Sequence, residues 1–286
     1  MFGKAEKFLE LFLGIKVSDS TIYRVCNRVG QHLPEQELVK PGQDLGKLQQ
    51  QPKATVYGMI DGSMVSTEQG WVETKLGRTI AFGSQHTPAK RSQAMADSEY
   101  VAHRGNCEEF KAKFERLYPP DSLCKQIFVS DGATWISKWV SERYPKAIQI
   151  LDYYHAVEHM AKAAEYAPDA KKWLKIQKKR LLENQLNLVI KDIEAIKSLP
   201  KEICRSLLKY LENNAYRMNY KHYRQQGWFI GSGAIESAHK TLIQARMKLS
   251  GQWWSNSGCD NILKLRVALM SNKGKLLKNV ILRKAA

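Results

Sequence analysis

Strand-forming segments occur only between residues 54 and 151 of this 286-residue sequence, and helix-forming or polar segments fill most of the rest. The first of them, residues 54–60, is apolar and β-rich. Residues 70–77 alternate between polar and apolar side chains, and residues 78–82 follow directly after a glycine. Short β-rich segments joined by brief turns are typical of an antiparallel meander. We therefore predict three antiparallel strands at the start of a sheet.

Two further strands alternate with helices after this meander. Residues 107–117 and 135–143 favour helices, whereas residues 126–130 and 147–151 are short apolar segments that each run into an aspartate. This order of elements is that of a ribonuclease-H-like layer, which has three strands, a helix, a strand, a helix, a strand and closing helices. The sequence thus predicts an α/β fold in which a mixed sheet is flanked by helices.

A long segment without any strand pattern interrupts this order. Helix formers dominate residues 153–226, which we expect to be an all-helical insertion. The core would then comprise residues 53–152, as its first part, and residues 227–270, as its closing helices. Residues 271–286 are rich in lysine and are expected to form a basic tail.

The N-terminal residues 1–33 predict two short helices. Gly14 breaks the first helix, and Ser18 is placed to cap the exposed amides of the second. Such a pair is either a DNA-binding helix-turn-helix or an ordinary helical hairpin, and both interpretations remain open. Residues 34–52 are polar, contain glycines and are expected to form a linker.

The charge of the chain points to a polyanionic partner. Lys and Arg together number 45 against 28 Asp and Glu, which gives a net charge of +17. Nucleic acid is the commonest polyanion in a cell, although a merely basic enzyme is the alternative. No apolar run approaches the roughly 20 residues of a membrane-spanning helix, and the charged N-terminus is unlike a secretory signal. We expect a cytoplasmic, nucleoid-associated protein.

Two aspartates are the first candidates for chemistry. Asp61 and Asp131 each follow an apolar strand, and each is followed at once by a glycine. A carboxylate at the end of a buried strand lies at the sheet edge where open sheets build their sites, and the glycine leaves room for a ligand. Two converging carboxylates favour a hard divalent cation between them. The alternative is that Asp-Gly is simply a common turn.

Glu236 is the third acidic candidate. Ser232 is a plausible N-cap, which would place Glu236 in the first turn of a helix at residues 234–248. In that helix we expect Leu242 and Ala245 to pack inward. The alternative is a first-turn glutamate that complements the helix dipole and pairs with a lysine four residues later.

Four segments together resemble bacterial insertion-sequence transposases, and among them the ISKra group of the DDE superfamily. The resemblance covers residues 14–270. Its segments are the strand ending in Asp61-Gly62, Val129-Ser130-Asp131-Gly132-Ala133, Leu151-Asp152-Tyr153-Tyr154-His155 and Gly231-Ser232-Gly233-Ala234-Ile235-Glu236-Ser237. It implies a ribonuclease-H-like fold with an all-helical insertion, and a DDE triad of Asp61, Asp131 and Glu236 that binds two Mg²⁺ or Mn²⁺ ions. It also implies that Asp152 and His155 lie beside the site and support catalysis or DNA binding.

The activity implied by this resemblance is DNA cleavage and strand transfer of an insertion sequence. One ion activates a water or a DNA 3′-hydroxyl, and the other stabilises the leaving oxygen. The implied partner is double-stranded DNA, both as transposon ends and as target. We expect a homodimer, because two transposon ends must be paired.

Several basic residues are candidates for holding DNA phosphates, with solvated surface charge as the alternative. They lie on the helix of Glu236, in the helical insertion and on the second N-terminal helix. They are Arg246, Lys248, Lys171, Lys172, Lys175, Lys179, Arg180, Arg24 and Arg28.

Two other functions remain open. His155 to His159 match the H-x-x-E-H pattern of a zinc peptidase, with Glu158 between the histidines. That function would leave the three acidic motifs without a role and would not need the basic charge. The second alternative is a non-catalytic, DNA-binding fragment of a transposase, because such proteins usually carry more sequence upstream of the helix pair.

Overall fold

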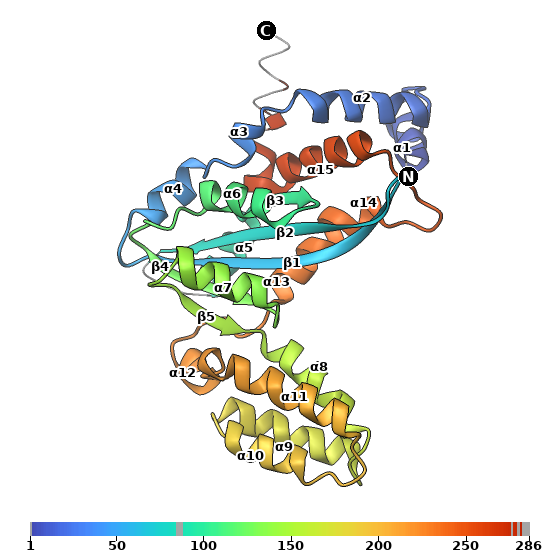
Figure 1. The fold of residues 1–286 in the computed structure, drawn as a ribbon. Coiled ribbons are helices and arrows are strands. Elements are labelled where there is room, and N and C mark those ends of the chain that lie inside the picture. The colour runs from blue at the N-terminus through green and yellow to red at the C-terminus, as the bar shows by residue number, and fades with distance from the viewer. Residues whose placement is uncertain (1, 84–87, 276, 279–280, 282–286) are drawn as a thin grey trace. The chain divides into compact units, whose positions relative to one another are not determined.

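The computed structural model describes residues 2–83, 88–275, 277–278 and 281, and it confirms a mixed α/β fold with a five-stranded sheet flanked by helices (Figure 1). The strand order is β3-β2-β1-β4-β5. Strands β1, β2 and β3 pair antiparallel, and β4 pairs with β5 in parallel. The strands are β1 (Thr55–Thr67), β2 (Gly70–Phe82), β3 (Glu99–Arg104), β4 (Lys125–Ser130) and β5 (Ile148–Leu151).

The chain divides into two compact units. Unit 1 comprises Met1–Cys124 and Ala234–Ala286, and unit 2 comprises Lys125–Gly233. Besides β1 to β3, unit 1 holds α1 (Gly3–Leu13), α2 (Asp19–His32), α3 (Glu35–Leu38), α4 (Gln43–Gln49), α5 (Pro88–Ala96), α6 (Cys107–Leu117), α13 (Gly233–Ala238), α14 (Ala245–Met247) and α15 (Asn256–Met270). Besides β4 and β5, unit 2 holds α7 (Thr134–Arg143), α8 (Tyr153–Ala164), α9 (Ala170–Leu182), α10 (Leu186–Glu194), α11 (Lys201–Asn214) and α12 (Tyr220–Gln225).

The first three strands differ from the predicted meander. Residues 70–77 and 78–82, expected as two strands, form the single strand β2, and the third antiparallel strand is β3. Gly77 continues β2 and pairs with Ile60 of β1. It lies under the ring of Phe114, which a Cβ at this position would overlap. The glycine therefore makes room for helix packing and is not a turn residue.

Helix α6 packs on β2 and β3 through the predicted apolar face. Phe110, Phe114 and Leu117 are all buried. The segment 34–52, expected as a linker, contains α3 and α4. Gln49 on α4 is buried, donates a hydrogen bond to the Leu117 carbonyl at 2.9 Å, and so ties this segment to the end of α6.

The predicted helix break and cap near the N-terminus are confirmed. Gly14 ends α1 in the left-handed conformation with φ of 64°, and the Ser18 side chain accepts a hydrogen bond from the Thr21 amide at the start of α2. Figure 1 shows α2 lying along α15. The two helices approach closely at Gly30, where a Cβ would overlap the Asn261 backbone carbonyl.

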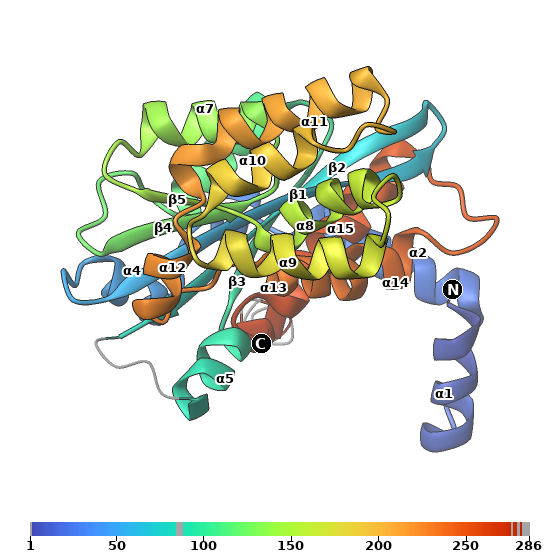
Figure 2. The same cartoon turned by 90° about the horizontal axis from the view of Figure 1, so that it is seen from below.

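In unit 2, aromatic side chains pack strand β4 against helix α7. Phe128 of β4 packs with Trp139 of α7 and with Tyr144, at ring-centroid distances of 6.2 and 4.7 Å. Residues 153–225 contain α8 to α12 and no strand. Figure 2 shows α9 and α10 side by side. Across the described residues, no helix has both the length and the apolar character needed to cross a membrane.

Candidate functional site

Asp61 lies within β1 and does not end it, which corrects the expectation from sequence. The ladder continues through this position, because Asp61 pairs with Leu76 and Gly62 pairs with Lys75. The side chain of Glu73 lies beside Gly62. A Cβ at Gly62 would lie 2.5 Å from a carboxylate oxygen of Glu73, which forms an ion pair of 2.7 Å with the buried Lys75.

The Asp61 carboxylate contacts the helix that carries Glu236. Helix α13 begins at Gly233, so Glu236 lies in its first turn as predicted, and its side chain is exposed. His239 follows three residues later, and its Nε2 lies 3.6 Å from Asp61 Oδ2. The Asp61 side chain is 35% exposed, whereas that of His239 is 3% exposed. Unit 1 therefore brings Asp61 to the helical segment of Glu236.

A π-helical turn, His239–Gln244, follows α13 directly. It inserts extra residues into the helix, so the inward positions change along the chain. Leu242 and Met247 are buried, whereas Ala245, which we expected to face inward, is exposed. The prediction for Ala245 was wrong because it assumed a regular helical period.

A buried arginine ties the start of α13 to β2. Arg78 donates hydrogen bonds to the carbonyls of Ala234 and Met95, at 2.5 and 2.8 Å, and to the Ser98 hydroxyl at 3.0 Å. Burial lowers the pKa of His239, while the neighbouring Asp61 carboxylate opposes that shift. The site in unit 1 thus pairs an accessible carboxylate with a buried imidazole that favours its neutral form.

Asp131 and Asp152 lie at one edge of the strand pair in unit 2. Each follows its strand directly, as predicted, and the Asp152 amide donates to the Ser130 carbonyl at 2.8 Å. Asp131 Oδ1 accepts from the Ala133 amide at 2.9 Å. Asp152 is buried and caps α8 by accepting from the Tyr154 amide at 2.8 Å. It also accepts a hydrogen bond from the Ser232 hydroxyl. The side chain of Asp152 therefore joins β5, α8 and the segment before α13.

Aromatic and basic side chains surround Asp131. A Cβ at Gly132 would overlap the ring of Tyr210, so this glycine also accommodates a neighbouring side chain. The ring of His159 stacks on Tyr210 at 4.1 Å. Arg217 is almost fully buried and donates to Asn214 and, at 3.3 Å, to the Ser130 hydroxyl. Burial lowers the pKa of Arg217, and the Asp131 carboxylate opposes that shift.

The two histidines of the H-x-x-E-H pattern lie close together. The rings of His155 and His159 have centroids 5.2 Å apart, and His155 Nδ1 lies 3.7 Å from a Glu158 carboxylate oxygen. Throughout the part of the chain that the structure describes, no three His, Cys, Asp or Glu side chains gather to hold a metal ion. The zinc-peptidase pattern therefore has no third protein ligand there.

The predicted basic residues differ in their surroundings. Nearly all of them are exposed: Arg24, Arg28, Lys171, Lys172, Lys175, Lys179, Arg246 and Lys248. Arg180 is half-buried and forms an ion pair with Asp192, so its guanidinium joins α9 to α10. The lysines of α9 recur at spacings of three and four residues and share its exposed face.

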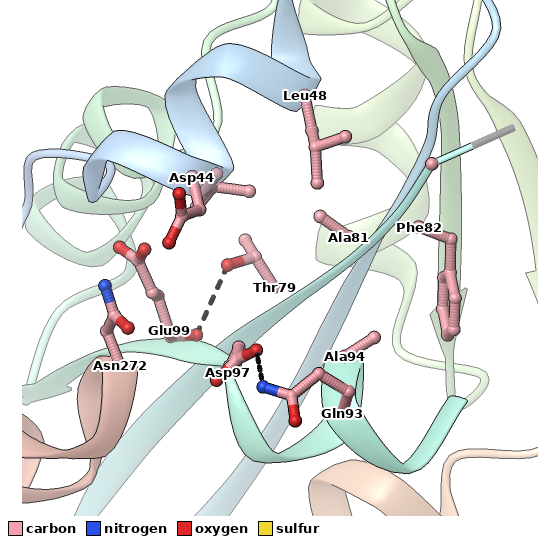
Figure 3. Close-up of a pocket in the computed structure, with 12 residues that line it drawn as sticks. Asp44, Leu48, Thr79, Ala81, Phe82, Gln93, Ala94, Asp97, Glu99 and Asn272 are labelled. Carbon is pink, nitrogen blue, oxygen red and sulfur yellow. Dashed lines mark hydrogen bonds between the residues drawn. The ribbon is translucent and has the colours of Figure 1, made fainter. Parts of the chain in front are cut away.

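A cavity outside the predicted site has a mostly apolar lining and a buried carboxyl group. Figure 3 shows this cavity of about 310 Å³ in unit 1, lined among others by Asp44, Thr79, Phe82, Glu99 and Asn272. Glu99 is 5% exposed and accepts hydrogen bonds of 2.8 and 3.0 Å from the Gly42 amide. Burial raises the pKa of Glu99 to about 7. No sequence motif marked this residue.

His239 is the other residue that the sequence did not reveal. A single histidine in a helix is more often part of a core, and its only distinguishing signal was its position one turn after Glu236. The contact with Asp61 depends on how the helix lies on the sheet, which the local sequence does not show.

The comparisons with known proteins identify a family. No curated protein matches the chain closely enough to count as a relative. A family model described as "Uncharacterised protein family (UPF0236)" matches residues 5–285. Since that match takes in almost every residue, the chain belongs to the UPF0236 family.

Proposed function

We propose that this chain is a DDE-type DNA transposase, which cleaves and joins DNA strands in a metal-dependent reaction. The observation that carries the proposal is the contact between Asp61 and the helical segment of Glu236. His239 Nε2 lies 3.6 Å from Asp61 Oδ2. This contact joins Asp61 to the helical segment that carries Glu236, and it supports our proposal that the two acids act at one site.

The sheet supports the finer fold assignment. We propose a ribonuclease-H-like sheet, and the strand order β3-β2-β1-β4-β5, with an antiparallel first half and a parallel pair β4 and β5, supports this proposal. The helical stretch 153–225 between β5 and α13 has the place of the all-helical insertion.

The side chains suit a hard divalent cation. Asp61 is partly exposed and Glu236 is exposed, so both carboxylates are accessible to an ion, and oxygen ligands are those that Mg²⁺ and Mn²⁺ prefer. Asp131, in unit 2, would supply the third carboxylate. Bound ions would activate a water or a 3′-hydroxyl and stabilise the leaving oxygen. No three such groups gather among the described residues. We therefore propose that the site is completed only when metal ions and DNA bind.

The substrate that we propose is double-stranded DNA, held by a chain with a net charge of +17. Exposed lysines of α9, together with Arg246 and Lys248, are the proposed phosphate contacts. We also propose that two copies act together, because transposition joins two ends, and that the protein works at the nucleoid.

The test is cleavage of a supercoiled plasmid in Mg²⁺ or Mn²⁺. Asp61→Asn, Asp131→Asn and Glu236→Gln should each slow nicking by about 100-fold or more, because each removes a proposed metal-binding charge. Asp121→Asn and Glu142→Gln make the same chemical changes at exposed acids and should leave the rate unchanged.

Full activity in the Glu236→Gln variant would contradict the triad. DNA binding by the wild type with no cleavage in either metal would favour the non-catalytic alternative.

A further inference from the structure

His239 is buried without a hydrogen-bonding partner. Its side chain is 3% exposed, and neither Nδ1 nor Nε2 has a partner at ordinary hydrogen-bond geometry among the described residues. Burial lowers the pKa of the ring, and the carboxylate and backbone of Asp61 are the groups that raise it. Buried polar groups are paired in the great majority of cases, and a histidine in a core usually donates from at least one nitrogen. Two unpaired ring nitrogens therefore require an explanation beyond packing.

The imidazole faces one oxygen of the Asp61 carboxylate. Nε2 lies 3.6 Å from Asp61 Oδ2, which is slightly longer than a hydrogen bond. The other oxygen, Oδ1, accepts a hydrogen bond of 2.7 Å from the Gly62 amide. Hydrogen bonds at catalytic sites are often long in the ligand-free protein and shorten when the ligand binds. The geometry is that of a donor held ready beside a carboxylate.

The helix fixes the position of the imidazole. His239 is the first residue of the π-helical turn, and π-turns within helices are frequent at functional sites. Ala238, Leu242 and Ile243 of the same helical segment are also buried, so His239 lies on the side of the segment that faces the interior. Glu236, one turn earlier, is exposed. The same short segment thus presents an outward carboxylate and an inward imidazole.

We infer that His239 is a positioning residue for Asp61. When a metal ion binds Asp61, the Nε2–H of His239 would move into hydrogen-bonding distance of Asp61 Oδ2 and hold the carboxylate in the orientation that binds the ion. The inference rests on the proposed function, since it assigns a role to Asp61 as a metal ligand. Hydrogen bonds to ligating carboxylates typically raise metal affinity by 10- to 100-fold.

The experiment is titration of the full chain with Mn²⁺ by calorimetry. His239→Phe and His239→Leu remove the donor and should weaken Mn²⁺ binding by about 10-fold or more. His239→Gln keeps an N–H donor and should recover most of the wild-type affinity. Gln244→Ala, an exposed change in the same π-turn, is the control and should bind Mn²⁺ as the wild type does. Circular dichroism verifies that each variant is folded. Two apolar variants are made so that the test can still be read if one of them does not fold.

The outcomes separate this inference from the proposed function. If the apolar variants bind Mn²⁺ as tightly as the wild type, while Asp61→Asn does not, His239 has no positioning role and the transposase proposal stands. Failure of His239→Gln to recover affinity would also overturn the inference, because shape alone would then explain the loss. If the wild type binds no Mn²⁺, or binds it equally well after Asp61→Asn, the proposed metal site itself is wrong.

Discussion

Buried polar side chains in unit 1 are compensated in different ways. Lys75 donates to the Glu73 carboxylate at 2.7 Å and to the Gly105 carbonyl at 2.6 Å. Arg78 donates to two carbonyls and a hydroxyl. Glu99, by contrast, accepts its hydrogen bonds from the Gly42 backbone amide, so its negative charge lacks full compensation. Burial therefore dominates and raises the pKa of Glu99 to about 7.

This raised pKa makes the stability of the chain depend on pH. The pKa of Glu99 rises from 4.5 to about 7 on folding, so the folded chain retains a proton that the unfolded chain has lost. The favourable contribution is complete below pH 4.5 and disappears as the pH rises through 7, a loss of about 3 kcal/mol in total. Glu99→Gln stays neutral, so its free energy of unfolding should fall less than that of the wild type between pH 5 and pH 8. Urea denaturation at both pH values measures the difference, and equal slopes for both proteins would exclude the effect.

Individual residues of the site were only partly predictable. Asp131 was placed correctly at a strand end, because an apolar run followed by Asp-Gly is a local pattern. The same pattern failed at Asp61, where pairing with β2 continues the strand. The space at Gly62 and Gly132 is filled by Glu73 and Tyr210, and such contacts between distant residues leave no local signal.

At the scale of elements, the contact between α2 and α15 depends on one glycine. Asn27 and Asn261 form a hydrogen bond of 2.9 Å across this contact, and Gly30 lies against the Asn261 carbonyl. The helical periods and the Ser18 cap were readable from sequence, because both are local properties. The partner of α2 was not, since α15 is more than two hundred residues away in the chain.

Replacement of glycine by alanine usually stabilises a helix, but at Gly30 we expect it to destabilise the chain. Gly30→Ala should destabilise the chain by about 2 to 3 kcal/mol, because its Cβ would overlap backbone atoms that cannot move independently. Gly3→Ala on α1, where a Cβ meets no atom within 4 Å, should instead be neutral or stabilise by up to about 1 kcal/mol. Thermal denaturation of the two variants checks the sign. A Gly30→Ala protein as stable as the wild type would show that α2 does not pack on α15 in solution.

At the scale of the whole molecule, net charge is the property that follows most directly from the sequence. The net charge of +17 is independent of the fold, whereas the location of the basic side chains is not. Lys171, Lys172 and Lys175 are exposed on one face of α9, while Arg180 is held by Asp192. We expect these lysines to contribute to DNA binding and Arg180 to contribute to helix packing.

The salt dependence of DNA binding tests this assignment. Each lysine that neutralises a phosphate contributes about 0.9 to the slope of log affinity against log salt concentration. The triple variant Lys171→Gln, Lys172→Gln, Lys175→Gln should therefore lower the slope by about 2 to 3. Fluorescence anisotropy with a labelled duplex measures it. The exposed Lys53 and Lys146, changed together to Gln, are the control, and an equal drop per lysine in both variants would mean that only net charge matters.

The π-helical turn between α13 and α14 places a limit on insertions. Loss of one residue within His239–Gln244 would let the helix rewind to its ordinary period. Because the turn holds the extra residue, this rewinding offsets the deletion, and Met247 would keep its place in the interior. A further inserted residue, by contrast, would turn Met247 away from the interior, so the chain should tolerate shortening of this turn better than lengthening.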